Sequence, residues 1–335
     1  MAWIDNTRIF AIFAVIILHV SGRIVVESDL GSTYWWYGNV YDSLVRWCVP
    51  VFVMISGALL LDPGKHESVS TFYKKRVAKI LIPIVCWSIL YLCWSYTTGI
   101  LNGHEPSIEK MVRNCFQGTP YYHMWFLYMI IGLYMFTPFL RIIIAHSTMK
   151  NLKILIILMF VFSIASSFYA KFIPSSKPLF LNMFLPYLAY FLIGYYIRKD
   201  TRLFSKALLC AVFMIATAST VLGCYYISIT YGFSNGLYFY DYFSITVVPM
   251  SISLMYLLKS WAVPIVNDKV ATKTASLVLG IYLVHPLVIA ISYHFNVTTN
   301  FSPLFSIPII SIYIFVISLL ISWAISQVPY LRRTI

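Results

Sequence analysis

Two ionisable residues, Arg8 and His19, lie in the first apolar segment of the chain, Trp3–Gly22. A charged or titratable side chain costs roughly 3 kcal/mol at the centre of a membrane, so such a residue points to a function. The two are eleven positions apart, and a rotation of about 100° per residue brings both to nearly the same face of a helix. Arginine can hold an anion in this setting, and an imidazole can act as a general base near neutral pH.

His285 is a third candidate, because it lies about midway along a later apolar segment and precedes Pro286. Structural interpretations remain open for all three residues. His285 could satisfy backbone groups that the proline leaves open. His19 could form a hydrogen bond between helices, and Arg8 could extend its side chain to the membrane interface.

A basic segment follows the second apolar run and contains Lys75, Arg76 and Lys79. Lys75 and Lys79 are four residues apart and Arg76 and Lys79 three apart, so a helix would place them on one face. Such a group could hold the phosphates of a polyphosphate ligand by charge-assisted hydrogen bonds. It could equally be an ordinary basic segment beside a membrane.

The composition identifies the elements that must position these residues. Of the 335 residues, 60% are hydrophobic and 10% charged, and the mean hydropathy is +0.81. A soluble domain carries about 25% charged residues, and a membrane-spanning helix needs about 20 apolar ones. We therefore expect an all-α, polytopic integral membrane protein with about ten transmembrane helices. The expected spans are 4–22, 43–61, 80–99, 123–140, 154–172, 180–197, 207–228, 242–258, 274–294 and 305–328.

The connections between these spans are short, so we expect one domain over residues 1–335 with no soluble extension. Most of the 24 lysines and arginines fall in the loops on one side of the membrane. The positive-inside rule then predicts that both termini are cytoplasmic. The basic charge reflects this topology, and no motif suggests binding to nucleic acid. Cysteine and histidine spacing predicts no metal site.

Several polar and aromatic residues belong to the side expected to face outward. His123 opens a span and is interpreted as an interfacial residue, while Asp42 and Arg46 are expected to form a local salt bridge. Aromatic side chains gather in the same loops, where they could form an interfacial belt or contact a sugar ring. They are Tyr34, Trp35, Trp36, Tyr37, Tyr121, Tyr122, Tyr238, Phe239, Tyr240 and Tyr242.

Taken in order, these motifs resemble the acyltransferase-3 family of integral membrane O-acyltransferases. The first segment, with Trp3-Ile4-Asp5-Asn6 before Arg8 and His19, is similar to the family's first helix. The later matches are Val49–Leu60 with its Ser56-Gly57, Lys75-Arg76-x-x-Lys79 before Pro83, Trp125-Phe126-Leu127, Phe191–Tyr195 and Gly280–Pro286. The chain looks most like the compact members that O-acetylate surface polysaccharides such as the enterobacterial common antigen.

The resemblance implies an enzyme of the bacterial plasma (inner) membrane with no permanently bound cofactor. Its donor substrate would be a cytoplasmic acyl-CoA, with acetyl-CoA expected, and its acceptor a hydroxyl of a surface or exopolysaccharide glycan at the outer face. His19 would be the general base, and Arg8 would steer the donor's phosphopantetheine or fix charge at the mouth of the site. Lys75, Arg76 and Lys79 would hold the phosphates of CoA. The remaining candidates, as donors to the oxyanion, are Trp125, Tyr282 and His285.

Other interpretations remain open. Direct transfer and an acyl-histidine intermediate are both compatible with these residues. A transporter or flippase of a polysaccharide or lipid-linked glycan could also use intramembrane arginine and histidine, although no inverted repeat is evident. The chain could act as a homo-oligomer or with partners in polysaccharide synthesis. For the enzyme, we expect Arg8, His19 and His285 to face one continuous polar passage.

Overall fold

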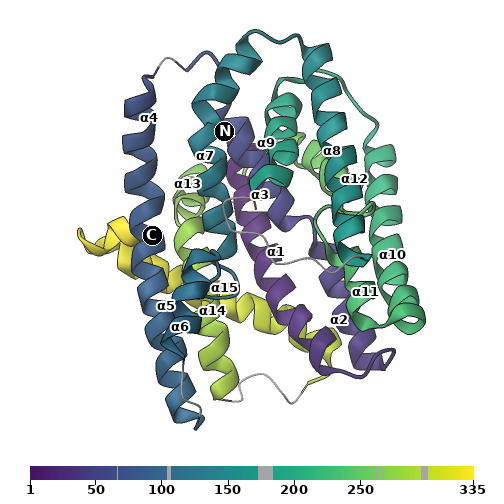
Figure 1. The fold of residues 1–335 in the computed structure, drawn as a ribbon, viewed down its shortest axis with the longest axis vertical. Coiled ribbons are helices and arrows are strands. Elements are labelled where there is room, and N and C mark those ends of the chain that lie inside the picture. The colour runs from purple at the N-terminus through teal and green to yellow at the C-terminus, as the bar shows by residue number, and fades with distance from the viewer. Residues whose placement is uncertain (66, 104–106, 173–183, 262, 266, 296–300) are drawn as a thin grey trace.

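The computed structural model describes residues 1–65, 67–103, 107–172, 184–261, 263–265, 267–295 and 301–335. Within these ranges the regular elements are all helices, and no strand is present. Most helices run roughly along the long axis of the molecule (Figure 1). The all-α prediction is therefore confirmed.

Helix α1, Ala2–Glu27, lies at the centre of the bundle and packs against α2 (Thr33–Val45), α3 (Cys48–Leu60) and α15 (Pro303–Gln327). The turn between α1 and α2 uses Gly31, whose φ of +82° is accessible to glycine with little strain. Ser32 then caps α2 by accepting a hydrogen bond from the Trp35 N–H at 3.2 Å. These features hold Arg8 and His19 on a helix that is buried among its neighbours.

Helices α3 and α9 (Phe184–Lys199) cross with their backbones in direct contact. A Cβ atom at Gly57 would overlap the main-chain carbonyl of Phe191, and one at Gly194 would overlap that of Met54. Small residues allow this close approach between membrane helices. The crossing fixes α3, whose neighbouring residues line the candidate site.

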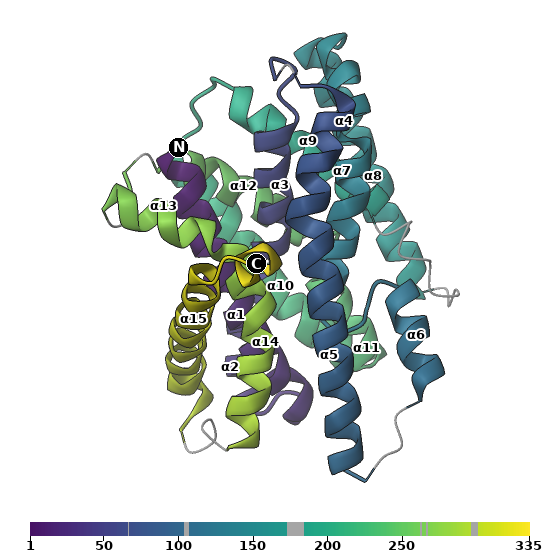
Figure 2. The ribbon, with the colours of Figure 1, turned by 90° about the vertical axis from the view of Figure 1, so that its left-hand side faces the viewer.

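A long helical arm stands beside this centre (Figure 2). It comprises α4 (Val69–Arg76), a π-helical turn (Val77–Leu81) and α5 (Ile82–Leu101), which run on without a break. It is followed by α6 (Ile108–Phe116), α7 (Trp125–Ala145) and α8 (Met149–Phe172). The π-helical turn carries Lys79, and such turns are often found at functional sites.

The C-terminal half completes the bundle. Its elements are α10 (Lys206–Tyr231), α11 (Phe233–Gly236), the 3₁₀ turn η3 (Leu237–Tyr240), α12 (Val247–Lys259), α13 (Asp268–Ser276), α14 (Val278–His294), α15 and the 3₁₀ turn η4 (Leu331–Thr334). The chain end returns to the arm, where the Trp87 Nε1–H donates a hydrogen bond of 2.8 Å to the Thr334 carbonyl. The C-terminus thus lies against α5.

Each of the ten expected spans overlaps a helix, but their lengths differ from the expectation. Among the described residues, six helical segments are long and apolar enough to cross a membrane, or seven if α13 and α14 count as one span bent by 60°. Helix α9 has 16 residues and α12 has 13, fewer than the roughly 20 that a span needs. Residues 180–183 of one expected span lie outside the described residues. The chain is a multi-pass membrane protein, while the count of ten stays a prediction.

Candidate active site

A cavity of about 340 Å³ lies between α1, α3, the π-helical turn, α7 and α14. Three cationic side chains line it, namely Arg8, Arg76 and Lys79, and we call it the cationic cavity. Most of the remaining lining is apolar, with Ser56 and Tyr282 among the polar exceptions. The structure thus brings together three residues from different elements that sequence analysis assigned to one donor site.

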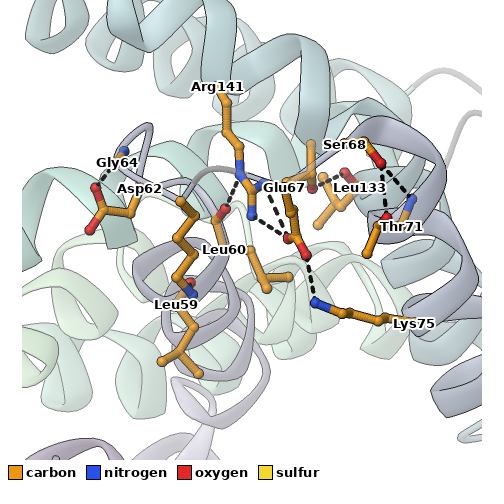
Figure 3. Close-up of polar contacts among 12 residues, drawn as sticks. Leu59, Leu60, Asp62, Gly64, Glu67, Ser68, Thr71, Lys75, Leu133 and Arg141 are labelled. Carbon is orange, nitrogen blue, oxygen red and sulfur yellow. Dashed lines mark hydrogen bonds and ion pairs between the residues drawn. The ribbon is translucent and has the colours of Figure 1, made fainter.

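Several nearby basic residues outside the cavity are paired with carboxylates. Glu67 accepts from Lys75 at 3.0 Å and from Arg141 at 3.3 Å (Figure 3). The hydrogen bond from Lys75, together with that from Arg141, holds the pKa of the Glu67 carboxyl below its ordinary value. Lys75 is therefore engaged by Glu67 and does not line the cavity with Arg76 and Lys79.

Two other carboxylates, those of Asp62 and Asp200, also pair with basic side chains. Asp62 lies 3.7 Å from Arg198 and 3.6 Å from Lys199. Asp200 binds Arg202 at 2.7 Å, and this pair, with the Tyr256 hydroxyl, lowers the pKa of the Asp200 carboxyl.

The cations of the cavity lack such partners. Within the described ranges, Arg8, Arg76 and Lys79 form no ion pair with a carboxylate. The Nε atom of Arg76 is buried and has no hydrogen-bond partner, and its guanidinium lies 5.2 Å from the ring centre of Phe72. Positive charge around a cavity, without carboxylates in ion-pair contact, favours an anionic ligand.

Three histidines form a second group, the histidine cluster, deeper in the protein. The His19 ring is stacked on that of His285, with 5.3 Å between ring centroids and 24° between ring planes. The His123 ring meets His285 edge-on at 5.7 Å. His285 and His123 are 0% and 1% exposed, whereas His19 is half-buried and also contacts the Tyr122 ring at 5.0 Å.

Tyr282 connects the cationic cavity with the histidine cluster. Its side chain lines the cavity, and its ring centroid lies 5.2 Å from that of His123. Its hydroxyl donates a hydrogen bond to the main-chain carbonyl of His123. Neither His19 nor His285 lines the cavity, so the cavity does not form the expected continuous passage from Arg8 to the histidines.

The ring nitrogens of the cluster differ in their partners. His285 Nδ1 lies 3.1 Å from the Ile281 carbonyl oxygen, while its Nε2 has no partner. Both ring nitrogens of His123 are buried without a partner. Buried polar atoms usually have a hydrogen-bond partner, so these three nitrogens call for an explanation.

Two other sequence candidates lie beside this group. Trp125, at the start of α7, stacks on Tyr242 with 5.9 Å between ring centroids and also packs on Tyr187. The Arg46 guanidinium pairs with the Asp42 carboxylate at 2.5 Å, which confirms the expected local salt bridge. Trp125 thus faces a group of aromatic rings, and no ring contact joins it to the three histidines.

His123 was interpreted from the sequence as an interfacial residue and was not among the predicted functional residues. The residue stands in the turn before α7, where no helical periodicity indicates the direction of its side chain. The available signal was its place after Tyr121 and Tyr122 and directly before the Trp125-Phe126 motif.

Comparison with known proteins adds one match. A family model described as an acyltransferase domain covers residues 1–326. No curated protein and no solved structure matches the chain.

Proposed function

This chain belongs to the acyltransferase-3 family, and from that premise we propose that it moves an acyl group from acyl-CoA to a glycan hydroxyl. The proposed acceptor is a surface or exopolysaccharide glycan at the outer face of a bacterial inner membrane, as in the compact members that act on such polymers. Acetyl is the expected acyl group. The family supports a membrane acyltransferase, and the site's geometry supports the finer assignments as follows.

The unpaired cations of the cationic cavity carry the proposal. CoA combines several phosphates with a long, less polar pantetheine arm that ends in the thioester. Arg76 and Lys79 lie on the helical arm and Arg8 lies across the cavity on α1, so phosphates can be held from two sides. The mostly apolar wall suits the arm, and Tyr282 marks the route from the cavity to the histidines.

The proposed reaction begins at His19. Its imidazole takes the proton from the acceptor hydroxyl, and the hydroxyl oxygen bonds to the thioester carbonyl carbon. The carbon–sulfur bond then breaks, and the CoA thiolate receives the proton from His19. The half-buried His19 contacts Tyr122, whose exposed fraction of 48% provides a side from which a glycan can approach.

The sidedness of the reaction follows from charge. The cationic cavity lies at the end of the bundle that carries the basic loops, and the positive-inside rule places such loops in the cytoplasm. Both termini are proposed to face that side. A cytoplasmic donor and an outer acceptor would then meet within the membrane, and only the acyl group would change sides.

The test uses purified protein in proteoliposomes, acetyl-CoA labelled in the acetyl group, and glycan extracted from source cells that lack the gene. The wild type should transfer label to glycan, and His19→Ala should not. His146→Ala is the matched control, because His146 is an exposed histidine at the end of α7. A succinyl-CoA arm identifies the acyl group. Absence of transfer from either donor, with movement of lipid-linked glycan across the bilayer, would instead support the flippase.

A further inference from the structure

His123 presents a problem that the proposed function leaves unsolved. The residue is 1% exposed, and neither of its ring nitrogens has a hydrogen-bond partner. A buried polar atom without a partner costs free energy, so such atoms persist mainly where a ligand or water is to be bound. Its ring is enclosed by those of Tyr91, Tyr121, Tyr282 and His285, which keep it away from lipid.

The hydrogen bonding of His285 determines whether its free ring nitrogen can donate a hydrogen bond. The Ile281 carbonyl can only accept, so His285 Nδ1 at 3.1 Å must carry the hydrogen. A fully buried imidazole without a carboxylate partner is neutral, because an unpaired buried charge is costly. The Nε2 atom of His285 is therefore an acceptor and has no hydrogen to donate.

His123 differs because its two nitrogens are both unpartnered. In either neutral tautomer one nitrogen carries a hydrogen, so His123 always retains one N–H that is free to donate. The Tyr282 hydroxyl is already engaged, since it donates to the carbonyl of His123 itself.

The position of His123 favours negative charge nearby. It precedes α7, a helix of 21 residues, and the Phe126 N–H approaches its carbonyl at 3.4 Å. The N-terminal end of a helix carries partial positive charge. His123 also lies next to Tyr282, which lines the cationic cavity, and next to His285, which stacks on His19. It is thus placed between the proposed donor site and the proposed base.

We propose that His123 is a further catalytic residue, whose free N–H donates a hydrogen bond to the thioester carbonyl oxygen as that oxygen becomes negatively charged. This inference rests on the proposed function. When the acceptor oxygen bonds to the carbonyl carbon, the electron pair of the C=O π bond moves to its oxygen, where the N–H stabilises it. The pair returns as the carbon–sulfur bond breaks, and the thiolate takes the proton that His19 removed from the hydroxyl.

The experiment compares His123→Phe, which keeps a planar ring without nitrogen, with His123→Gln, whose amide can still donate. His146→Phe serves as the control for an exposed histidine. Turnover is measured with labelled acetyl-CoA and glycan, and CoA affinity is measured by calorimetry. A third readout is the affinity for trifluoroacetonyl-CoA, a ketone analogue whose hydrated carbonyl carries a tetrahedral carbon.

We expect His123→Phe to lower kcat by about 10²–10³-fold, as for loss of one oxyanion donor, with CoA affinity unchanged. The affinity of His123→Phe for trifluoroacetonyl-CoA should also fall. His123→Gln should retain part of the wild-type kcat and part of the affinity for the analogue. A purely structural role of His123 would not produce this pattern. His123→Leu supplies a second variant without a donor if His123→Phe does not fold.

The outcomes separate this inference from the proposed function. If the wild type transfers acetyl and a folded His123→Phe has the same turnover and the same affinity for the analogue, only the role of His123 is overturned. A wild type that transfers no acyl group overturns both.

Discussion

The hydroxyl of Tyr282 donates a hydrogen bond to the main-chain carbonyl of His123, and the same side chain lines the cationic cavity. One tyrosine therefore contacts both groups that the proposed reaction needs. His19 and His285 do not line the cavity, so Tyr282 marks where the proposed donor would approach them.

His19→Ala should abolish acyl transfer and leave CoA binding intact. The imidazole is the proposed base, and loss of a general base lowers rates by about 10²–10⁴-fold. Since His19 does not line the cationic cavity, the affinity for CoA should match that of the wild type. Turnover with labelled acetyl-CoA and calorimetry with CoA provide the two measurements. Near-normal turnover would remove the assignment of His19 as the base.

Replacing Arg76 and Lys79 together by glutamine should lower the affinity for the donor more than it lowers kcat. Both line the cationic cavity without a carboxylate partner, so their charges contribute to binding in the ground state and the transition state alike. We expect a higher KM for acetyl-CoA, a smaller change in kcat and a weaker dependence of KM on salt. The control replaces Lys74 and Lys150, two exposed lysines outside the cavity. Equal CoA affinity in the two double variants would contradict the phosphate-binding role.

Some of this site could be predicted from the sequence because its residues obey helical periodicity. Arg8 and His19 both lie on the regular helix α1, where the spacing between them gives the shared face. Lys75 does not line the cationic cavity with Lys79, and the π-helical turn Val77–Leu81 interrupts the regular α-helix between them. Lys75 instead reaches Glu67, which is not its neighbour on the helix.

Features outside regular helices were less predictable. His123 stands in a turn, so its approach to His285 depends on tertiary packing that no periodic pattern encodes. Helix breaks were equally hidden, because continuous apolar sequence does not reveal the break at 46–47 or the 60° bend after Ser276. Mean hydropathy measures how apolar a segment is, but it does not indicate whether the helix is straight or bent.

Gly57→Ala and Gly194→Ala should each destabilise the protein. An added Cβ atom would overlap a carbonyl of the facing helix, and overpacking of this kind costs about 1–3 kcal/mol or more. Because the α3–α9 crossing fixes the wall of the cationic cavity, CoA affinity should fall as well. Thermal unfolding in detergent is the measurement. Gly64→Ala is the matched control, since its Cβ would meet only the Asp62 side chain at 3.5 Å. Unchanged stability in both helix variants would contradict the close crossing.

Glu67 should make the stability of the protein depend on pH in the acidic range. Hydrogen bonds from Lys75 and Arg141 lower the pKa of its carboxyl in the folded state, relative to about 4.3 for an unfolded chain. The stabilisation is fully present above the unfolded pKa and is lost as the pH falls through the lower, folded pKa. The unfolding temperature of Glu67→Gln should therefore lie below that of the wild type at neutral pH and fall less on acidification. Parallel pH profiles for the two proteins would show that Glu67 contributes no such linkage.

Cysteine labelling from each side of the membrane should separate the two ends of the site. The accessible cysteines are first replaced by serine, namely Cys86, Cys93, Cys115 and Cys210. Cys48 and Cys224 are kept because they are buried. Ser56→Cys then places a thiol in the cationic cavity, and Tyr122→Cys places one beside His19.

In oriented vesicles, an impermeant maleimide should reach Ser56→Cys only from the cytoplasmic side and Tyr122→Cys only from the other. CoA should protect the first thiol because its phosphates and arm would fill the cavity, and it should leave the second exposed because only the acyl end passes Tyr282. Labelling of both positions from one side would contradict a donor and an acceptor that enter from opposite faces. Labelling of each position from both sides would indicate alternating access and favour a transporter, because a fixed acyltransferase site opens to each substrate from one side.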